Sequence, residues 1–136
     1  MADSFKFELV SPERLLVSED VESVVVPGSD GEMTVMAYHA PVMSTLKPGI
    51  VTTTKTGGQT ERYVVYGGFA DILPDGCTLL AESATTVSEV DPNDVTQRIQ
   101  NAREDVTDAK DAETKADAEA MLSHLELLEK AISMSR

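Results

Sequence analysis

The chain has 136 residues, of which 41% are hydrophobic, and a formal net charge of −13 at pH 7. A chain of this length can bury a core without disulfides or metals, as one domain or as a domain of about 90 residues with an appendage. Acidic side chains outnumber basic ones 13 to 5 in residues 1–90 and 11 to 6 in residues 91–136. Because nucleic acids and anionic lipid surfaces attract basic patches, this charge argues against nucleic acid as a partner and against direct adsorption to a membrane.

The sequence also lacks signals for export, membrane insertion and disulfide formation. No apolar run approaches the roughly 20 residues that span a bilayer, and the first residues, Met1 to Lys6, carry no basic and apolar leader. The single cysteine, Cys77, cannot form an internal disulfide and has no Cys or His at metal-binding spacing, so a buried strand position is its simplest interpretation. We therefore expect a cytosolic chain that is not inserted in the membrane.

From Phe5 to Glu89 the apolar residues alternate with polar ones or form short β-branched runs, which is typical of strands. The pattern predicts strands around Phe5–Leu9, Val21, Val24–Val26, Met33–Val35, Ile50–Val51, Tyr63–Tyr66, Phe69–Leu73 and Leu79–Leu80. Turn sequences separate them at Ser11-Pro12-Glu13, Pro27-Gly28, Lys47-Pro48-Gly49, Gly57-Gly58 and Pro74-Asp75-Gly76. Many short strands without intervening helices predict an N-terminal antiparallel β-sandwich or barrel over residues 1–89.

Residues 93–136 contain no Gly or Pro and repeat apolar residues at helical spacing. Asp91 is placed to cap a first helix, and Pro92 suits its first position, where a missing N–H is harmless. Two apolar stripes follow, out of phase with each other: Val95, Ile99, Ala102, Val106 and Ala109, then Ala118, Met121, Leu125, Leu128 and Ile132. The phase change predicts a break between Asp111 and Thr114, with Thr114 starting the second helix.

We therefore expect a mainly β plus α fold, in which the sandwich is followed over residues 90–136 by a C-terminal antiparallel two-helix hairpin. Its two helices, each about 17 residues long, would pack through the ten side chains of the two stripes. Because the chain from Ala109 to Ala120 is rich in alanine, it would also accept a continuous helix. A hairpin that opens and one that stays closed are both compatible with these residues.

The chain offers no recognisable catalytic, cofactor or metal motif. Its two histidines, His39 and His124, fall in a loop and in a helix, which does not suggest a metal centre. Neither common glycine-rich phosphate loop occurs, and no Gly-x-Ser-x-Gly nucleophile elbow occurs. The densest turn sequence, Pro27 to Glu32, holds two acids that a loop tip would leave solvated. We therefore expect no enzyme activity and no cofactor, and we interpret this loop, with the nearby His39-Ala40-Pro41, as an organised contact surface.

Several segments, in their order and spacing, are similar to those of a known family: Phe7–Glu13, Val26–Met33, His39-Ala40-Pro41, Leu46–Gly49, Gly67–Ala70 and the alanine-rich helical tail. Over nearly the whole chain they resemble the epsilon subunits of bacterial F-type, proton-translocating rotary ATP synthases. The resemblance implies an N-terminal β-sandwich, a C-terminal helical hairpin and a non-catalytic subunit of the central stalk, the rotor.

The resemblance also implies partners, contacts and a location. In this family the sandwich lies on the gamma subunit and touches the c-ring, so that proton-driven rotation reaches the catalytic head and drives ATP synthesis. The matching residues would face the c-ring: Asp30, Gly31, Glu32, His39, Ala40 and Pro41. The subunit would be peripheral, at the cytoplasmic face of the inner membrane. The alternative at this loop is that Gly28 and Gly31 only shape the turn and that Glu32 is solvated.

In the same family the hairpin can extend along gamma toward the alpha and beta subunits and block ATP hydrolysis, and in some members its compact form binds ATP. This chain departs from the ATP motif, an acid followed three residues later by Arg-Ala, because Asp94 and Arg98 are four residues apart and Ile99 follows. Residues 114–136 hold three basic and four acidic side chains, so docking against an acidic segment of the catalytic head would be weak. We expect no bound nucleotide and only weak inhibition.

Two other functions remain as alternatives from the residues. One is a free-standing ligand-binding β-sandwich whose hairpin serves as a lid or as a dimerisation element. The other is an isolated hydrolase, which only scattered carboxylates support. Co-purification with a membrane-bound ATPase would separate the rotor subunit from both.

Overall fold

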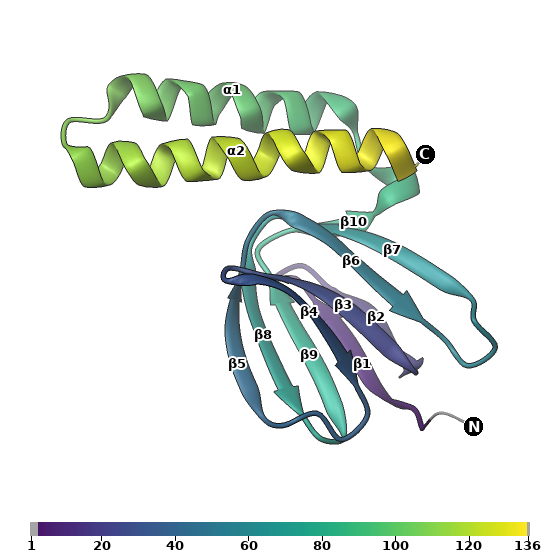
Figure 1. Cartoon of the computed structure of the whole chain (residues 1–136). Helices are drawn as coiled ribbons and strands as arrows, with labels where there is room; N and C mark the ends of the chain where they lie inside the picture. Colours follow the sequence, from purple (N-terminus) through teal and green to yellow (C-terminus); the bar gives the residue numbers. More distant parts are fainter. Residues whose placement is uncertain (1–2, 136) are drawn as a thin grey trace. The chain divides into compact units, whose positions relative to one another are not determined.

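The computed structural model describes residues 3–135, apart from the side chain of Ser135. These residues form two compact units, of which the first ends at Thr86 and the second begins at Val87. The first is a β-sandwich and the second is a helical hairpin (Figure 1), which confirms the predicted fold class. The division falls slightly before the expected one at residue 89, because the 3-10 turn η1 (Val87–Glu89) groups with the helices. Residues 1, 2 and 136, which the predicted domains include, lie outside the described residues.

Within the described residues, ten strands pair as one continuous ten-stranded sheet that folds into two layers of five strands, named sheet I and sheet II below. In spatial order, sheet I consists of β4 (Gly31–Met36), β3 (Ser23–Gly28), β6 (Gly49–Thr54), β7 (Thr60–Val65) and β10 (Ala84–Thr86). Sheet II consists of β5 (Val42–Leu46), β8 (Gly68–Leu73), β9 (Gly76–Ala81), β1 (Phe5–Val10) and β2 (Leu15–Val21), again in spatial order. A single residue pair, Gly28 with Leu46, joins the two sheets at one corner.

These ten strands pair in antiparallel fashion with one exception. Strand β1 runs parallel to β9, with Lys6 opposite Gly76 and Val10 opposite Leu80. The predicted antiparallel sandwich is therefore antiparallel except at this pair. A parallel pair needs a long connection, and in this sandwich nearly all the other strands lie between the two in sequence. Local alternation of residues shows that β1 is a strand but does not show which strand it joins.

The core lies between the inner faces of the two sheets. Side chains from both sheets are fully buried there: Phe7, Leu9, Ile72 and Leu79 from sheet II, and Val24, Val26, Val51 and Val65 from sheet I. Burial of each such side chain stabilises the fold by about 1.5–3 kcal/mol. Because side chains alternate between the faces of a strand, the core also determines which residues of each strand point outward.

The turn after β3 is shorter than predicted. Pro27 and Gly28 are not turn residues but the last two residues of β3, opposite Glu32 and Gly31. The connection to β4 is therefore the dipeptide Ser29-Asp30. Proline is tolerated in this strand because β6 pairs only with Ser23–Val25, so at Pro27 the strand has already left β6.

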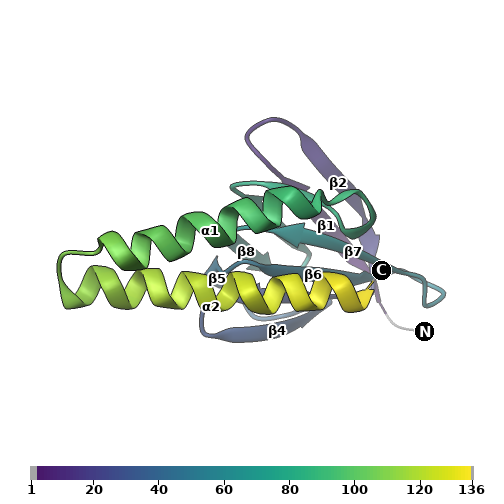
Figure 2. The same cartoon turned by 90° about the horizontal axis from the view of Figure 1, so that it is seen from above.

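The hairpin consists of α1 (Pro92–Asp108) and α2 (Ala112–Ser135), which lie side by side in both views (Figures 1 and 2). Asp91 caps α1 by accepting a hydrogen bond from the Asn93 N–H at 2.9 Å, and Pro92 is the first helical residue, as predicted. The start of α2 differs from the prediction. The Asp111 carboxylate accepts from the Thr114 N–H at 2.7 Å, so Asp111 and not Thr114 caps this helix. The helix α2 therefore begins at Ala112, and because it continues to Ser135 it has 24 residues instead of about 17.

The two predicted stripes differ in burial along the hairpin. Six of the ten side chains are buried, namely Val95, Ile99, Ala102, Leu125, Leu128 and Ile132. Val106, Ala109 and Ala118 are half-buried, and Met121 is 42% exposed. The four less buried residues are those nearest the turn between the helices. An ion pair at 3.7 Å links the helices beside the buried residues Ala102 and Leu125, between Arg103 and Glu126. Both of its side chains are more than half exposed, so it adds little.

Gly68 lies at the start of β8 with a φ of +129°, and a Cβ added there would collide with the Leu80 carbonyl oxygen. Gly58 also has a positive φ, +89°, but a Cβ at this residue would meet nothing within 4 Å. We expect Gly68→Ala to lower the free energy of unfolding by more than about 2 kcal/mol and Gly58→Ala by about 1 kcal/mol. Urea unfolding followed by circular dichroism measures both. Equal losses would show that the clash at Leu80 is relieved without cost.

The hydrogen bond from the Thr114 N–H holds the pKa of the Asp111 carboxyl below its ordinary value of 3.8. A lowered pKa in the folded state stabilises the hairpin above pH 3.8, and this contribution is lost as the pH falls through the folded value. We expect NMR titration to place the Asp111 pKa below 3.8. The variant Asp111→Asn keeps a capping side chain and should lose this part of the acid dependence of helix unfolding. An Asp111 pKa at or above 3.8 would contradict the cap.

Candidate functional site

The turn between β3 and β4 is anchored to a neighbouring strand. The Ser29 N–H donates to the Thr45 carbonyl at 2.9 Å, and the hydroxyls of Ser29 and Thr45 are in hydrogen-bond contact. The Lys47 N–H donates to the Pro27 carbonyl at 3.1 Å. These bonds tie the β3 side of the turn to β5 and the residue after it, while the β4 side is held through its pairing with β3. The side chains of Asp30 and, on β4, Glu32 are exposed. The sandwich therefore presents two carboxylates from a fixed position.

The segment that contains His39-Ala40-Pro41 connects β4 to β5. Tyr38 has a φ of 65°, and its N–H donates to the Pro74 carbonyl at 2.8 Å. His39 is half-buried, and its Nδ1 lies 2.7 Å from the Ala40 carbonyl oxygen. The imidazole is thus engaged with its own loop, which fits a structural role in the connection.

The structure does not bring the two predicted contact segments together. Asp30 and Gly31 lie where β4 begins, and His39 follows the end of the same strand. Six strand residues at about 3.3 Å each separate the segments by roughly 20 Å. Asp30, Gly31 and Glu32 therefore share one end of the sandwich with Lys47, whereas His39, Ala40 and Pro41 share the other end with Pro74.

A further surface has no counterpart in the predictions from the sequence. An apolar row crosses the outer face of sheet II, where Phe69 is opposite Leu80, Leu80 is opposite Val10, and Val10 is opposite Leu15. Phe69, Leu80 and Leu15 are each half exposed, at 54%, 50% and 53%. A groove of about 340 Å³ opens beside this row and is also lined by Ser11, Pro12 and Glu82. The row depends on strand register, so neighbouring residues along the chain give no sign of it.

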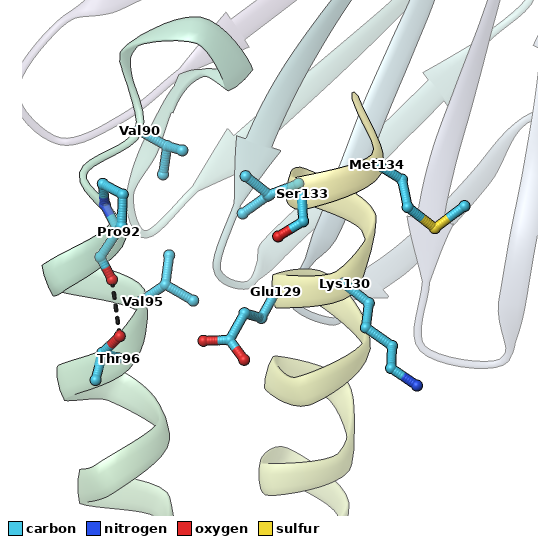
Figure 3. Close-up of a pocket in the computed structure, with 9 residues that line it drawn as sticks. Val90, Pro92, Val95, Thr96, Glu129, Lys130, Ser133 and Met134 are labelled. Carbon is cyan, nitrogen blue, oxygen red and sulfur yellow. Dashed lines mark hydrogen bonds between the residues drawn. The ribbon is translucent and has the colours of Figure 1, made fainter. Parts of the chain in front are cut away.

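The hairpin holds a larger cavity of about 620 Å³, between the start of α1 and the end of α2 (Figure 3). Its lining is mostly apolar and includes Val95 and Ile132. Figure 3 shows Glu129 pointing toward α1 and Lys130 pointing away from it. Near the start of α1, Arg98 donates to Asp94 Oδ2 at 3.1 Å. A polyphosphate needs several cations, and among the described residues that line the cavity only Lys130 is basic.

No metal centre is formed by the described part of the chain, because no three His, Cys, Asp or Glu side chains in it gather closely enough to hold an ion. Among the helices of residues 3–135, none combines the length and the hydropathy that a bilayer crossing needs. Cys77 is buried on β9, and burial together with the Asp71 charge raises the pKa of its thiol to about 12.

Two solved structures of mitochondrial ATP synthases contain a chain with a fold similar to this one. One shows the OSCP, F1 and c-ring of the Euglena gracilis enzyme, and its similar chain is 25% identical with a TM-score of 0.74, over 95% of this chain and 81% of that one. The other shows the central stalk and c-ring of the Tetrahymena thermophila enzyme, with a TM-score of 0.69 over 96% of this chain and 98% of that one. At 14% identity this second likeness concerns the fold alone.

Sequence comparison is more specific. The model of the β-sandwich domain of ATP synthase delta/epsilon chains matches residues 4–87. The ATP synthase epsilon chain of Mesorhizobium japonicum is 66% identical over 97% of this chain and 98% of its own length. Those of Chelativorans and Rhizobium meliloti are 58% and 59% identical, over 97% and 92% of this chain and 98% and 92% of their own lengths. The chain belongs to the ATP synthase epsilon-chain family, of the bacterial type, which confirms the resemblance seen in the sequence.

The raised pKa of Cys77 makes its thiol unreactive in the folded sandwich. With a pKa of about 12 the thiolate fraction at pH 8 is only about one in ten thousand. We expect a disulfide reagent such as DTNB to label the native chain at pH 8 at least about a hundredfold more slowly than the chain in about 6 M guanidinium chloride. Equal labelling rates in the two conditions would show that β9 is not stably packed.

Proposed function

We propose that this chain is a non-catalytic subunit of the central stalk, the rotor, of a proton-translocating ATP synthase. It couples rotation of the c-ring to ATP synthesis in the catalytic head, with the gamma subunit and the c-ring as its partners. As a peripheral subunit it works at the cytoplasmic face of the inner membrane. Membership in the epsilon-chain family and the F1 and c-ring context of the 25% identical Euglena gracilis chain support this proposal.

The observation that carries the proposal is the anchoring of the Ser29-Asp30 turn. A contact that transmits rotation must not yield under load, and three main-chain and side-chain bonds fix the β3 side of this turn to Thr45 and Lys47. We assign the c-ring contact to Asp30, Gly31 and Glu32. His39, Ala40 and Pro41 lie at the other end of β4, and their part in the c-ring contact stays a prediction.

For the hairpin we propose a regulatory role, a weak inhibition of ATP hydrolysis through the alpha and beta subunits. Its seam is least buried near the turn, where Val106 and Ala118 are only half covered, so opening from that end costs little burial. The excess of acidic over basic side chains in α2 weakens docking against an acidic surface.

A free-standing ligand-binding sandwich is the alternative that the hairpin cavity would favour. The lining of that cavity comes from residues 90–96 and 129–134 and includes no strand of the sandwich. A sandwich whose hairpin is a lid should contribute to the ligand site, so this cavity does not support the alternative.

The coupling contact can be tested in inverted membrane vesicles whose ATP synthase has lost its epsilon subunit. We expect the added wild-type chain to restore ATP-driven proton pumping. The variant Asp30→Asn/Glu32→Gln removes both carboxylates at the turn and should pump roughly two- to fivefold less per ATP hydrolysed, since the contact loses its polar pairing. Fluorescence quenching of a pH-sensitive dye measures pumping, and phosphate release measures hydrolysis.

The matched control is Asp3→Asn/Asp75→Asn, which removes two exposed carboxylates from the opposite end of the sandwich. This variant should pump like the wild type. If Asp30→Asn/Glu32→Gln also pumps like the wild type at equal occupancy of the complex, the assignment of the contact to this turn is wrong.

A further inference from the structure

One end of the sandwich interior is polar, beside the corner at which β2 leads into β3. Thr53 on β6 is fully buried there, and it lies opposite the core residue Val24, so its side chain points between the two sheets. Its hydroxyl has no hydrogen-bond partner within the described part of the chain. Because a buried hydroxyl without a partner costs free energy, a threonine at this position is unexpected unless something binds to it.

A carboxylate faces the same end of the interior from the other sheet. Glu19 on β2 is opposite the core residue Phe7, so it also points inward. Its Oε2 atom forms an ion pair at 3.1 Å with Lys55, which follows the end of β6 and lies two residues beyond Thr53. Its Oε1 atom is buried and has no hydrogen-bond partner in residues 3–135. One oxygen of this carboxylate is therefore satisfied and the other is not.

Main-chain contacts and electrostatics place the two unsatisfied oxygens in the same region. The Glu22 N–H donates to the Thr54 carbonyl at 2.7 Å, which holds the end of β2 against the end of β6. Tyr63 on β7 is a diagonal neighbour of Thr53, and burial together with the charge of Glu19 raises the pKa of its phenol to about 12. The Glu19 carboxylate therefore reaches the part of sheet I in which Thr53 stands, although the two oxygens do not bond each other.

The chemistry of the two oxygens identifies the ligand that fits between them. A carboxylate oxygen only accepts hydrogen bonds, whereas a hydroxyl both donates and accepts. A metal ion would need more ligands, and in the described chain no three acidic, His or Cys side chains gather to hold one. The cation beside Glu19 is already supplied by Lys55. A water molecule donates and accepts, and buried waters typically satisfy polar groups of this kind with about three hydrogen bonds.

We propose that an ordered internal water molecule binds between the sheets, where it donates to Glu19 Oε1 and accepts from Thr53 Oγ1. Together with the ion pair to Lys55, this water fastens β2, the last strand of sheet II, to the end of β6. The main-chain pair of Gly28 and Leu46 joins the sheets through β5, at the opposite edge of sheet II. The bound water thus closes the side of the sandwich that strand pairing leaves open. The proposal concerns the sandwich itself and is independent of the stalk function.

The sign of one stability change tests the proposal. Thr53→Val keeps the shape of the side chain and replaces the hydroxyl by a methyl group. We expect the urea midpoint of the sandwich to fall by roughly 0.3–1 M, because the water loses a partner and Glu19 Oε1 loses part of its solvation. Without a bound water the same change relieves an unsatisfied hydroxyl, so a midpoint equal to or above that of the wild type overturns the proposal.

Tyrosine fluorescence of the full-length chain is the appropriate signal for these midpoints. The chain has no tryptophan, and its three tyrosines, Tyr38, Tyr63 and Tyr66, all belong to the sandwich unit. The fluorescence therefore follows unfolding of the sandwich and not that of the hairpin.

The matched control is Thr52→Val, the same change on the same strand but on the outer face, where the side chain is half-buried. Valine favours strands at least as much as threonine does, so the control should keep the wild-type midpoint or exceed it slightly. A loss equal to that of Thr53→Val would show an effect of the strand alone and would overturn the proposal.

A double-mutant cycle tests whether the two oxygens are linked. In the Glu19→Ala chain the water has already lost its carboxylate, so Thr53→Val should lower the midpoint less than it does in the wild type. Equal losses in both chains would show that the residues act independently and that no water joins them.

Two further measurements identify the ligand. The wild-type midpoint should be the same in sodium chloride and in choline chloride at equal concentration, because both salts screen the ion pair alike. A gain specific to sodium would assign the site to a metal cation and overturn the assignment to water. A high-resolution crystal structure of the full-length chain should show one water within hydrogen-bond distance of Glu19 Oε1 and Thr53 Oγ1. A direct bond between these side chains, or a space without water, would contradict the proposal.

Discussion

The packing of sheet I against sheet II is the constraint on which the other features of the sandwich depend. Phe7, Leu79 and Ile72 from one sheet meet Val24, Val51 and Val65 from the other, and none of them retains exposed surface. Since the side chains of a strand alternate, a shift of any strand by one residue would expose this set to water. The same packing therefore holds the outward residues in register, and it places Glu8 and Asp71 on either side of Thr78.

Local patterns in the sequence were sufficient for the class of fold and for most of its elements. Alternation shows strands at Phe5–Leu9 and Tyr63–Tyr66, and the 3.6-residue repeat shows the helices, because both signals lie within a few consecutive residues. Pairings between segments that are far apart in the sequence leave no such local signal. The parallel pairing of β1 with β9 joins segments far apart in the chain, and the place of Pro27 depends on where β6 ends. At the hairpin turn the sequence predicted that Thr114 starts the second helix, whereas in the structure the Asp111 carboxylate caps it.

At the candidate contact surface, too, the local features could be predicted from the sequence and the long-range ones could not. The segment from Pro27 to Glu32 was recognisable from its composition as containing a tight turn, although only Ser29 and Asp30 connect the two strands. That His39-Ala40-Pro41 stands at the other end of the sandwich follows only from the length and direction of β4. The apolar row of Phe69, Leu80, Val10 and Leu15 draws its members from four strands, so it exists only once the register is set. Features that are made by pairing could not be found from one sequence.

The position of β1 has a consequence for how the chain folds as it is synthesised. Because β1 lies between β2 and β9, its second neighbour does not leave the ribosome until residues 76–81 have been made. Until then one edge of the β1–β2 hairpin is open, with Phe7 and Leu9 lacking their cover. The helices, by contrast, need only contacts within the last third of the chain. The sandwich therefore forms slowly, because its contacts join segments far apart in the chain and most of the strands must be made first. The hairpin is synthesised last, but it assembles from local contacts as soon as it emerges.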